Sequence, residues 1–233
     1  MIKVIYERER EDNMRQRKVK DEEEKLAKHH QYTVDKPKDF KGRWDKLFNN
    51  SNEIYIELGC GKGKFILTLA EQNPDKNFIA VEGRGSIILR ALEKATKSEL
   101  KNIIFLREYI RDIEEYFQVG EISGIYLNFS DPWPKDRHAK RRLTHNRYLQ
   151  GYKRILKPEH CLEFKTDNDT LFQFALEEFK NSHMNILECT VDLHSTELPA
   201  KYVTTEYEDK FKSSGKNINY CKVQPQTQGK ADD

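Results

Sequence analysis

The chain has 233 residues, of which 34% are charged and 36% hydrophobic, and its formal net charge is +2. This length suggests one domain with a substantial core. The sequence contains no run of 18 apolar residues, so we expect no transmembrane helix. It also has no apolar segment near its start, so we expect no secretory signal. The four cysteines lie far apart without a CxxC pair, which argues against a metal site or a disulfide scaffold, so we expect a cytoplasmic protein with reduced thiols, no metal and no membrane segment.

The two ends of the chain differ in composition from the middle. Residues 1–30 contain EREREDN and RQRKVKDEEEK and offer little to bury, so we expect a mobile, charged arm there. Residues 224–233 read as a disordered tail. The remaining residues, 31–223, are expected to form the folded domain.

Strand-like and helix-like patterns alternate within that domain. Short apolar runs predict strands at 53–58, 77–82, 102–106, 124–129, 161–166, 185–193 and 218–223. Apolar residues at helical spacing predict helices at 64–72, 86–98, 144–156 and 168–181, with no clear helix between the last two strands. This alternation predicts an α/β fold, a mostly parallel sheet with helices on both faces, in which ligands bind at the carboxyl ends of the strands.

A glycine-rich turn follows the first predicted strand and opens the first helix of that pattern. It reads Glu57-Leu-Gly59-Cys-Gly61-Lys-Gly63, and glycines there let the backbone turn sharply and approach a ligand closely. A dinucleotide fingerprint would place glycine or alanine at position 64, where this chain has lysine. The ExGxGxG form resembles motif I of class I methyltransferases, and its acid suits a ligand that carries an ammonium and a sulfonium.

An acidic residue also ends the next predicted strand. Glu82 closes the run IAVE, 25 residues after Glu57. A carboxylate at that place can accept hydrogen bonds from both hydroxyls of a ribose. Glu57, Glu82 and the three glycines together therefore predict a nucleoside-containing cofactor.

A second polar loop follows the fourth predicted strand, where substrate should meet cofactor. It reads Asn128-Phe-Ser-Asp131-Pro-Trp-Pro-Lys135, and its two prolines stiffen the backbone. Asp131 supplies a carboxylate, and Trp133 supplies a flat surface that either stacks on a base or supports the loop. The run from Lys135 to Arg142 that comes next is rich in lysine and arginine, which favours contacts with nucleic-acid phosphates.

From about Met14 to about Phe211 the chain resembles a known family, the bacterial tRNA (guanine-N7-)-methyltransferases (TrmB). The segments that carry the resemblance are KGRWDKLFNN, IELGCGKGKF, LNFSDPWPKDRHAKRRLTH, FKTDN and TTEYEDKF. The resemblance implies a class I S-adenosylmethionine-dependent methyltransferase fold of the Rossmann-like type. It also implies methyl transfer from S-adenosylmethionine to N7 of a tRNA guanosine, with the variable loop as the expected location. The partner is then tRNA, and the enzyme is a monomer or a homodimer.

The family pattern assigns roles to residues of this chain by their matching positions. S-adenosylmethionine would lie against the cofactor loop and the acids Glu57 and Glu82. Asp131 would contact the cofactor and is also the expected catalytic residue. The residues expected to bind tRNA are Lys135, Asp167, Thr205, Glu206, Tyr207 and Glu208, joined by Arg137 and Arg141 of the basic run and, in the arm, by Arg15, Arg17 and Lys18.

Two features depart from the family pattern. The family has an acid after the third strand that reads the adenine amino group, and the aligned residue here is Tyr109, so Glu108, Asp112 or a backbone carbonyl would have to replace it. Family members commonly begin at a sequence like Met14-Arg-Gln-Arg17, so residues 1–13 are either an extension or precede the true start.

Three alternative hypotheses for the function remain at this point. An amino-directed N6-adenine or N4-cytosine methyltransferase would have adjacent prolines before the aromatic residue of the loop, and SDPWP lacks them. An NAD-dependent oxidoreductase is disfavoured by Lys64 and by the absence of a separate substrate domain. A non-catalytic RNA-binding module would keep the basic run but would not need Glu57, Glu82 and the glycine loop together.

Overall fold

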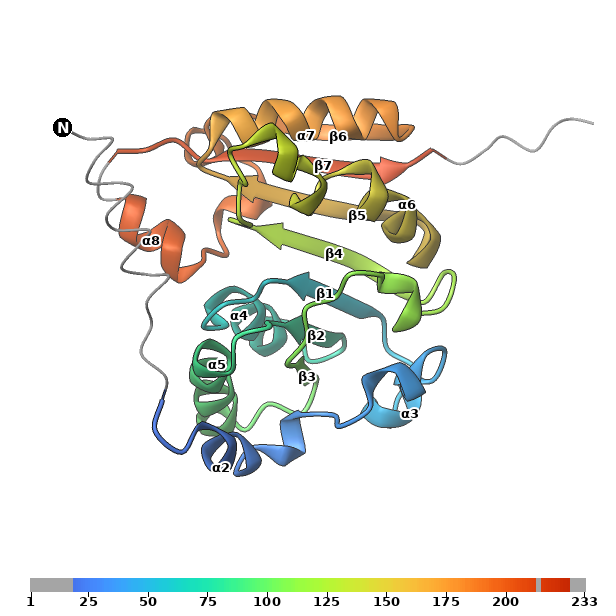
Figure 1. Ribbon diagram of the computed structural model, residues 1–233, viewed down its shortest axis with the longest axis vertical. Coiled ribbons are helices and arrows are strands. Elements are labelled where there is room, and N and C mark those ends of the chain that lie inside the picture. The colour runs from blue at the N-terminus through green and yellow to red at the C-terminus, as the bar shows by residue number, and fades with distance from the viewer. Residues whose placement is uncertain (1–18, 213–214, 227–233) are drawn as a thin grey trace, which may run out of the picture.

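A computed structural model describes residues 19–212 and 215–226 of the chain (Figure 1). A seven-stranded sheet forms its centre, with the strand order β3-β2-β1-β4-β5-β7-β6. The strands are β1 (Ile54–Leu58), β2 (Asn77–Val81), β3 (Ile103–Leu106), β4 (Ile122–Asn128), β5 (Leu156–Thr166), β6 (Met184–Thr190) and β7 (Asn219–Pro225). Strands β1 to β5 pair in parallel, whereas β7 runs antiparallel to both β5 and β6. The predicted α/β fold is thereby confirmed.

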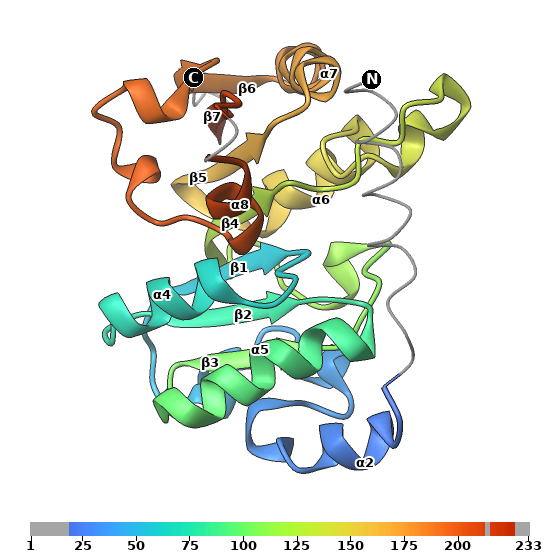
Figure 2. The same ribbon diagram turned by 90° about the vertical axis from the view of Figure 1, so that its left-hand side faces the viewer.

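Helices cover both faces of the sheet (Figures 1 and 2). The α-helices are α2 (Glu22–Ala27), α3 (Trp44–Phe48), α4 (Lys64–Gln72), α5 (Gly85–Ser98), α6 (Asn146–Ile155), α7 (Asp169–Asn181) and α8 (Glu206–Lys212). Short 3₁₀ turns connect them: η1 (His30–Tyr32), η2 (Pro37–Phe40), η3 (Ile113–Glu115), η4 (Asp136–Arg141), η5 (Leu193–Ser195) and η6 (Pro199–Lys201). Helix α8 lies beyond these two layers, at the side of the sheet where the parallel strands end (Figure 1).

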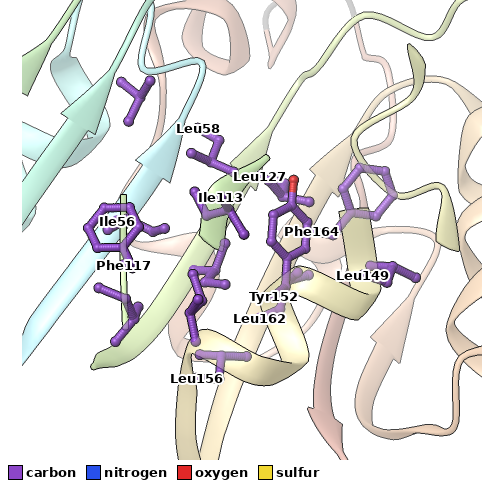
Figure 3. Close-up of a cluster of buried hydrophobic side chains, with 14 of the residues drawn as sticks. Ile56, Leu58, Ile113, Phe117, Leu127, Leu149, Tyr152, Leu156, Leu162 and Phe164 are labelled. Carbon is purple, nitrogen blue, oxygen red and sulfur yellow. The ribbon is translucent and has the colours of Figure 1, made fainter. Parts of the chain in front are cut away.

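The side chains of each strand point alternately to the two faces of the sheet, and this divides the core into two hydrophobic clusters. Within β2, Phe78 and Ala80 face α4 and α5, while Ile79 and Val81 face the opposite layer, because successive side chains of a strand point to opposite faces. Figure 3 shows part of the larger cluster, in which Leu149 and Tyr152 of α6 pack toward strands β1, β4 and β5. The two clusters fix the strands from both sides, so the loops at the carboxyl ends of the strands start from defined positions.

The boundary between α6 and β5 differs from the prediction. The helix was expected over 144–156 and the strand over 161–166, whereas α6 ends at Ile155 and β5 begins directly at Leu156. Pro158 lacks a backbone N–H, and it falls where the β4–β5 register shifts and Glu159 adopts a positive φ of 63°. A bulge of this kind accommodates a proline inside a strand.

The segment between β6 and β7 also differs from the prediction. No helix was expected there, but α8 forms over EYEDKFK, a sequence without a clear apolar stripe. Its start is fixed by Thr205 and Glu208: the Glu208 N–H donates to Thr205 Oγ1 at 2.9 Å, and the Thr205 N–H donates to Glu208 Oε2 at 3.3 Å. This reciprocal capping box explains a helix that apolar periodicity does not reveal.

The predicted arm at 1–30 and the predicted tail at 224–233 lie partly outside the described residues. Within the arm, α2 packs against α5 near the β3 edge of the sheet (Figure 2), and Glu23 pairs with Arg107 at 2.7 Å. Tyr32 is buried and its hydroxyl donates to the Ala95 carbonyl at 3.0 Å. Packed structure therefore includes residues before position 31, and at the other end β7 runs to Pro225.

Candidate active site

The cofactor loop connects β1 to α4 through three glycines in the left-handed region. Gly59, Gly61 and Gly63 have φ angles of 85°, 57° and 82°. A Cβ at Gly63 would lie 2.7 Å from the Ala91 Cβ, so glycine at this position lets α4 approach α5. A Cβ at Gly59 or Gly61 would meet nothing within 4 Å, so the described residues leave space beside the loop at those two positions.

Glu57 is a buried carboxylate near the end of β1. Its Oε1 accepts a hydrogen bond from Asn128 Nδ2 at 2.8 Å, whereas Oε2 has no partner among residues 19–212 and 215–226. Burial raises the pKa of Glu57 to about 8 against an ordinary 4.5, and the nearby Glu206 charge also raises it. A buried carboxylate with an unpaired oxygen is suited to a cationic ligand.

Glu82 follows β2, whose last residue Val81 pairs with Leu58 of β1. The Glu82 carboxylate accepts the Arg84 N–H at 2.9 Å. Burial raises its pKa, and the Asp131 charge contributes in the same direction. Glu57, Glu82 and Asp131 therefore converge from the ends of three neighbouring strands, as the parallel sheet predicts.

The loop after β4 is held in a strained conformation that presents Asp131 to solvent. Phe129 and Trp133 have positive φ angles of 50° and 42°, which non-glycine residues rarely adopt. Arg142 is only 5% exposed, and it donates from Nε to the Pro132 carbonyl and from a terminal nitrogen to the Trp133 carbonyl, both at 3.0 Å. These two bonds fix the backbone on the C-terminal side of Asp131.

The predicted basic run therefore divides into two kinds of residue. Lys135, Arg137 and Arg141 are exposed, as phosphate contacts would require, whereas Arg142 is buried and structural. Trp133 does not stand free, because the Arg141 guanidinium lies 4.8 Å over its ring and His138 meets it edge-on. This arrangement favours the supporting role for Trp133 over base stacking.

The residues predicted around α8 are mainly internal. Asp167 is buried and accepts hydrogen bonds from the Tyr207 hydroxyl at 3.0 Å and from Lys216 Nζ at 2.8 Å. Glu208 is fully buried, with Lys165 Nζ 3.6 Å from its Oε2 and His194 Nε2 2.9 Å from its Oε1, the latter outside hydrogen-bonding geometry. These contacts attach the α8 segment to the end of β5.

Glu206 instead faces the cofactor loop. Its carboxylate accepts the backbone N–H of Lys64 at 3.2 Å and a hydrogen bond from Lys94 Nζ. Lys64 is the first residue of α4, so the negative charge lies at the positive end of that helix. The Lys64 side chain also bonds to Thr204 and pairs with Asp209. The structure thus connects α8 directly to the loop predicted to hold the cofactor.

Sequence reasoning missed Lys165, which has a structural role beside the site. It is 2% exposed, and its Nζ donates to the carbonyls of Ala200 and Val203 at 2.5 and 2.9 Å. Burial lowers the pKa of Lys165, while the Glu208 charge raises it. A lysine within a predicted strand gives no indication that it is buried. The one sequence feature that points to Lys165 is its place in the FKTDN segment that carries the family resemblance.

After β3, where the resemblance implies that an acid reads the adenine, the aligned residue Tyr109 lies at the surface. Tyr109 is 70% exposed, and its ring lies against Gly83, where a Cβ would come within 2.4 Å of it. The two acids proposed as substitutes already have partners, since Glu108 accepts from the Tyr116 hydroxyl at 3.3 Å and Asp112 accepts the Glu114 N–H at 3.0 Å.

Neither a metal cluster nor a membrane-spanning helix is present in the described part of the chain. No group of three or more His, Cys, Asp or Glu side chains could hold a metal ion. No helix is long and apolar enough to cross a membrane.

Comparisons with known proteins identify chains of similar sequence and structures of similar fold. A family model described as "Putative methyltransferase" matches residues 51–221. A tRNA (guanine-N(7)-)-methyltransferase of Clostridioides difficile (strain 630) is 46% identical over 211 residues, which cover 90% of this chain and 98% of that protein. The enzyme of the same name from Oceanobacillus iheyensis is 46% identical over 210 residues, with the same coverage. Among solved structures, an antibiotic-related methyltransferase has a TM-score of 0.58 at 19% identity and covers 84% of this chain and 98% of its own, a likeness of fold.

Proposed function

The chain belongs to the tRNA (guanine-N7-)-methyltransferase family, and from this premise we propose that its site residues act as their positions in the fold suggest. The protein is an S-adenosylmethionine-dependent enzyme that methylates N7 of a tRNA guanosine. The amino-directed methyltransferase, the oxidoreductase and the RNA-binding module are therefore set aside.

The cofactor would be held by Glu57, Glu82 and the loop of Gly59, Gly61 and Gly63. S-adenosylmethionine supplies an activated methyl group on a sulfonium when bound. The unpaired Oε2 of Glu57 fits the cationic end of that molecule, and Glu82 at the end of β2 fits the ribose hydroxyls. The space beside Gly59 and Gly61 admits a ligand against the backbone.

Asp131 is the proposed catalytic residue. N7 of guanine has a lone pair and no proton, so its methylation needs no general base. The purine gains positive charge as the new bond forms, and a carboxylate held nearby stabilises that charge more in the transition state than in the ground state. Arg142 fixes the strained loop, and Asp131 lies close enough to Glu82 for their charges to interact. Because the loop is already fixed, the Asp131 side of the site would lose little conformational entropy when the base binds.

The tRNA would lie across the exposed basic residues and the α8 segment. Lys135, Arg137 and Arg141 offer three cations to phosphates next to the Asp131 loop. Thr205, Tyr207, Glu208 and Asp167 hold α8 in place through the bonds described above, so their contribution would be to shape the wall of the substrate site. Glu206 would couple that wall to the cofactor loop through Lys64 and Lys94.

The observation that carries this assignment is the convergence of Glu57, Glu82 and Asp131 at the ends of β1, β2 and β4. It is tested by tritium-methyl transfer to unmodified tRNA, followed by nucleoside analysis. Asp131→Asn should bind S-adenosylmethionine, as judged by the rise in melting temperature that the ligand causes, yet lose most formation of 7-methylguanosine. Asp136→Asn, an exposed carboxylate five residues further on, is the matched control. Turnover of D131N close to that of wild type would reject the catalytic role.

We also infer the location, the domain limits and the assembly of the enzyme. Four free thiols suit a reducing compartment, and the substrate is tRNA, so we place the enzyme in the cytoplasm. We retain one methyltransferase domain over 31–223, extended at its start by α2, and a monomer or a homodimer as the assembly.

A further inference from the structure

The antiparallel strands β6 and β7 bring two cysteines face to face. Cys189 of β6 is registered directly opposite Cys221 of β7. Residues opposite each other on antiparallel strands point to the same face, with Cα atoms about 4.5 or 5.5 Å apart. Both values fall within the range of about 4.4–6.8 Å found across disulfides. The two thiols also interact directly, and this contact adds to the burial that raises the pKa of Cys221.

The two cysteines differ in their access to solvent. Cys221 is buried in the core beside Phe164, its partner on β5, whereas Cys189 is exposed on the strand at the edge of the sheet. A dissolved oxidant therefore reaches Cys189 and not Cys221. An exposed thiol beside a protected one is the arrangement in which a first oxidation product is trapped by a resolving thiol.

We propose that Cys189 and Cys221 form a reversible intramolecular disulfide when the enzyme meets a peroxide. Cys189 sulfur attacks one oxygen of hydrogen peroxide and breaks the O–O bond, which gives a sulfenic acid and one water. Cys221 sulfur then attacks the Cys189 sulfur, its proton leaves with the departing hydroxyl as a second water, and the S–S bond forms. Two thiols are oxidised and one peroxide is reduced to two waters.

The register shift next to the pair gives the strands room to adjust. It falls between Ile186 and Glu188, just before Cys189. Opposite Cβ atoms lie about 4.5–5.5 Å apart in such a pair, whereas a disulfide requires about 3.8 Å, so the strands must move slightly closer. A disulfide formed in this way is accessible and readily reduced by a dithiol.

The bond would close the chain segment from 189 to 221, which contains α8 and the Glu206 contact with the cofactor loop. Oxidation thus restrains the segment that the proposed function places at the substrate site. The disulfide itself does not depend on that function, because it needs only the register and the exposure of the two thiols.

Peptide mapping of the full chain tests the proposal directly. Trypsin places each cysteine in a separate peptide, namely 181–201 for Cys189, 217–222 for Cys221, 155–165 for Cys161 and 47–62 for Cys60. After treatment with hydrogen peroxide and alkylation of the remaining thiols, peptides 181–201 and 217–222 should appear linked, at about 2 Da below their summed mass. The link should disappear on treatment with dithiothreitol, and the other two cysteines should remain alkylated.

Cys189→Ser is the variant that decides the assignment, since the site is exposed and the change is small. In this variant the linked peptide should be absent, and Cys221 should be alkylated to the same extent with and without peroxide. The control variant Cys161→Ser should leave the link intact. Either of two results would overturn the proposal: Cys189 carried to a sulfinic acid while Cys221 stays reduced, or Cys189 linked to Cys189 of a second chain. Methyl transfer by the reduced C189S enzyme, measured in parallel, keeps a failure of the disulfide separate from a failure of the proposed function.

Discussion

Replacing Glu57 with glutamine should remove a proton release that accompanies cofactor binding. Burial raises the pKa of Glu57 to about 8, so about 0.9 of the molecules carry a proton on this carboxyl at pH 7 before the cofactor binds. A ligand with an ammonium and a sulfonium favours the ionised carboxylate and lowers that pKa. If the value returns toward the ordinary 4.5, binding releases about 0.9 proton for each cofactor at pH 7.

The sign of the pH dependence follows from the same shift. Protonation of Glu57 competes with the cofactor below pH 8, so affinity should rise with pH, by about tenfold between pH 6 and pH 7. Isothermal titration calorimetry in phosphate and in Tris at pH 7 counts the released protons, because the two buffers differ in ionisation enthalpy. Any proton change of the cofactor itself is common to wild type and variants and cancels in the comparison.

A matched control comes from a second, partly buried carboxyl outside the site. Burial also raises the pKa of Glu163, which accepts a hydrogen bond from the Tyr220 hydroxyl at 3.0 Å. E163Q should release protons as wild type does, whereas E57Q should bind more weakly and release almost none. Equal release from E57Q and wild type would refute the reasoning, as would the loss of release in E163Q.

Three further predictions concern residues around the site. Arg142→Ala removes two hydrogen bonds to the strained loop, and should lower the free energy of unfolding by about 2 kcal/mol and reduce turnover more than cofactor affinity; Arg137→Ala, at an exposed position, should change stability by less than about 0.5 kcal/mol in the same urea titration. Lys165→Met leaves Glu208 buried without its cation, and should destabilise by about 3–5 kcal/mol; the double variant with Glu208→Gln should recover part of this loss, and strictly additive losses would contradict the pairing. Arg137→Ala should weaken tRNA binding most at low salt and reduce the slope of log affinity against log salt by about 1 in filter-binding assays. An unchanged slope would remove Arg137 from the phosphate contacts.

The fold and the cofactor loop could be predicted because their signals are local. The strand EIYIEL, the three glycines and the helix that follows stand next to each other in the sequence, and the structure keeps them in that order. Glu82 and Asp131 were placeable for a related reason, because residues at the carboxyl ends of parallel strands meet at one edge whatever the details of packing.

The parts that could not be predicted depend on contacts distant in sequence. Arg142 looks like any other member of a basic run, and only the fold shows that it turns inward to the Pro132 and Trp133 carbonyls. Lys165 and Glu208 are charged residues that sequence reasoning leaves at the surface, yet they pair in the interior. The contact of Glu206 with Lys64 joins residues 142 positions apart, a separation that local patterns do not span.

The position of β7 in the sheet has a consequence for the order in which the protein can fold. Six strands precede it in the chain, yet it lies between β5 and β6 and pairs with both. During synthesis β6 therefore leaves the ribosome with no neighbour in its own sheet, and it stays unpaired until residues 219–225 follow. Such a non-local closure is slow compared with the formation of helices and adjacent strands. The cofactor half of the sheet, β1 to β4, can be complete while the chain is still growing, whereas β6 joins the sheet only with the last strand.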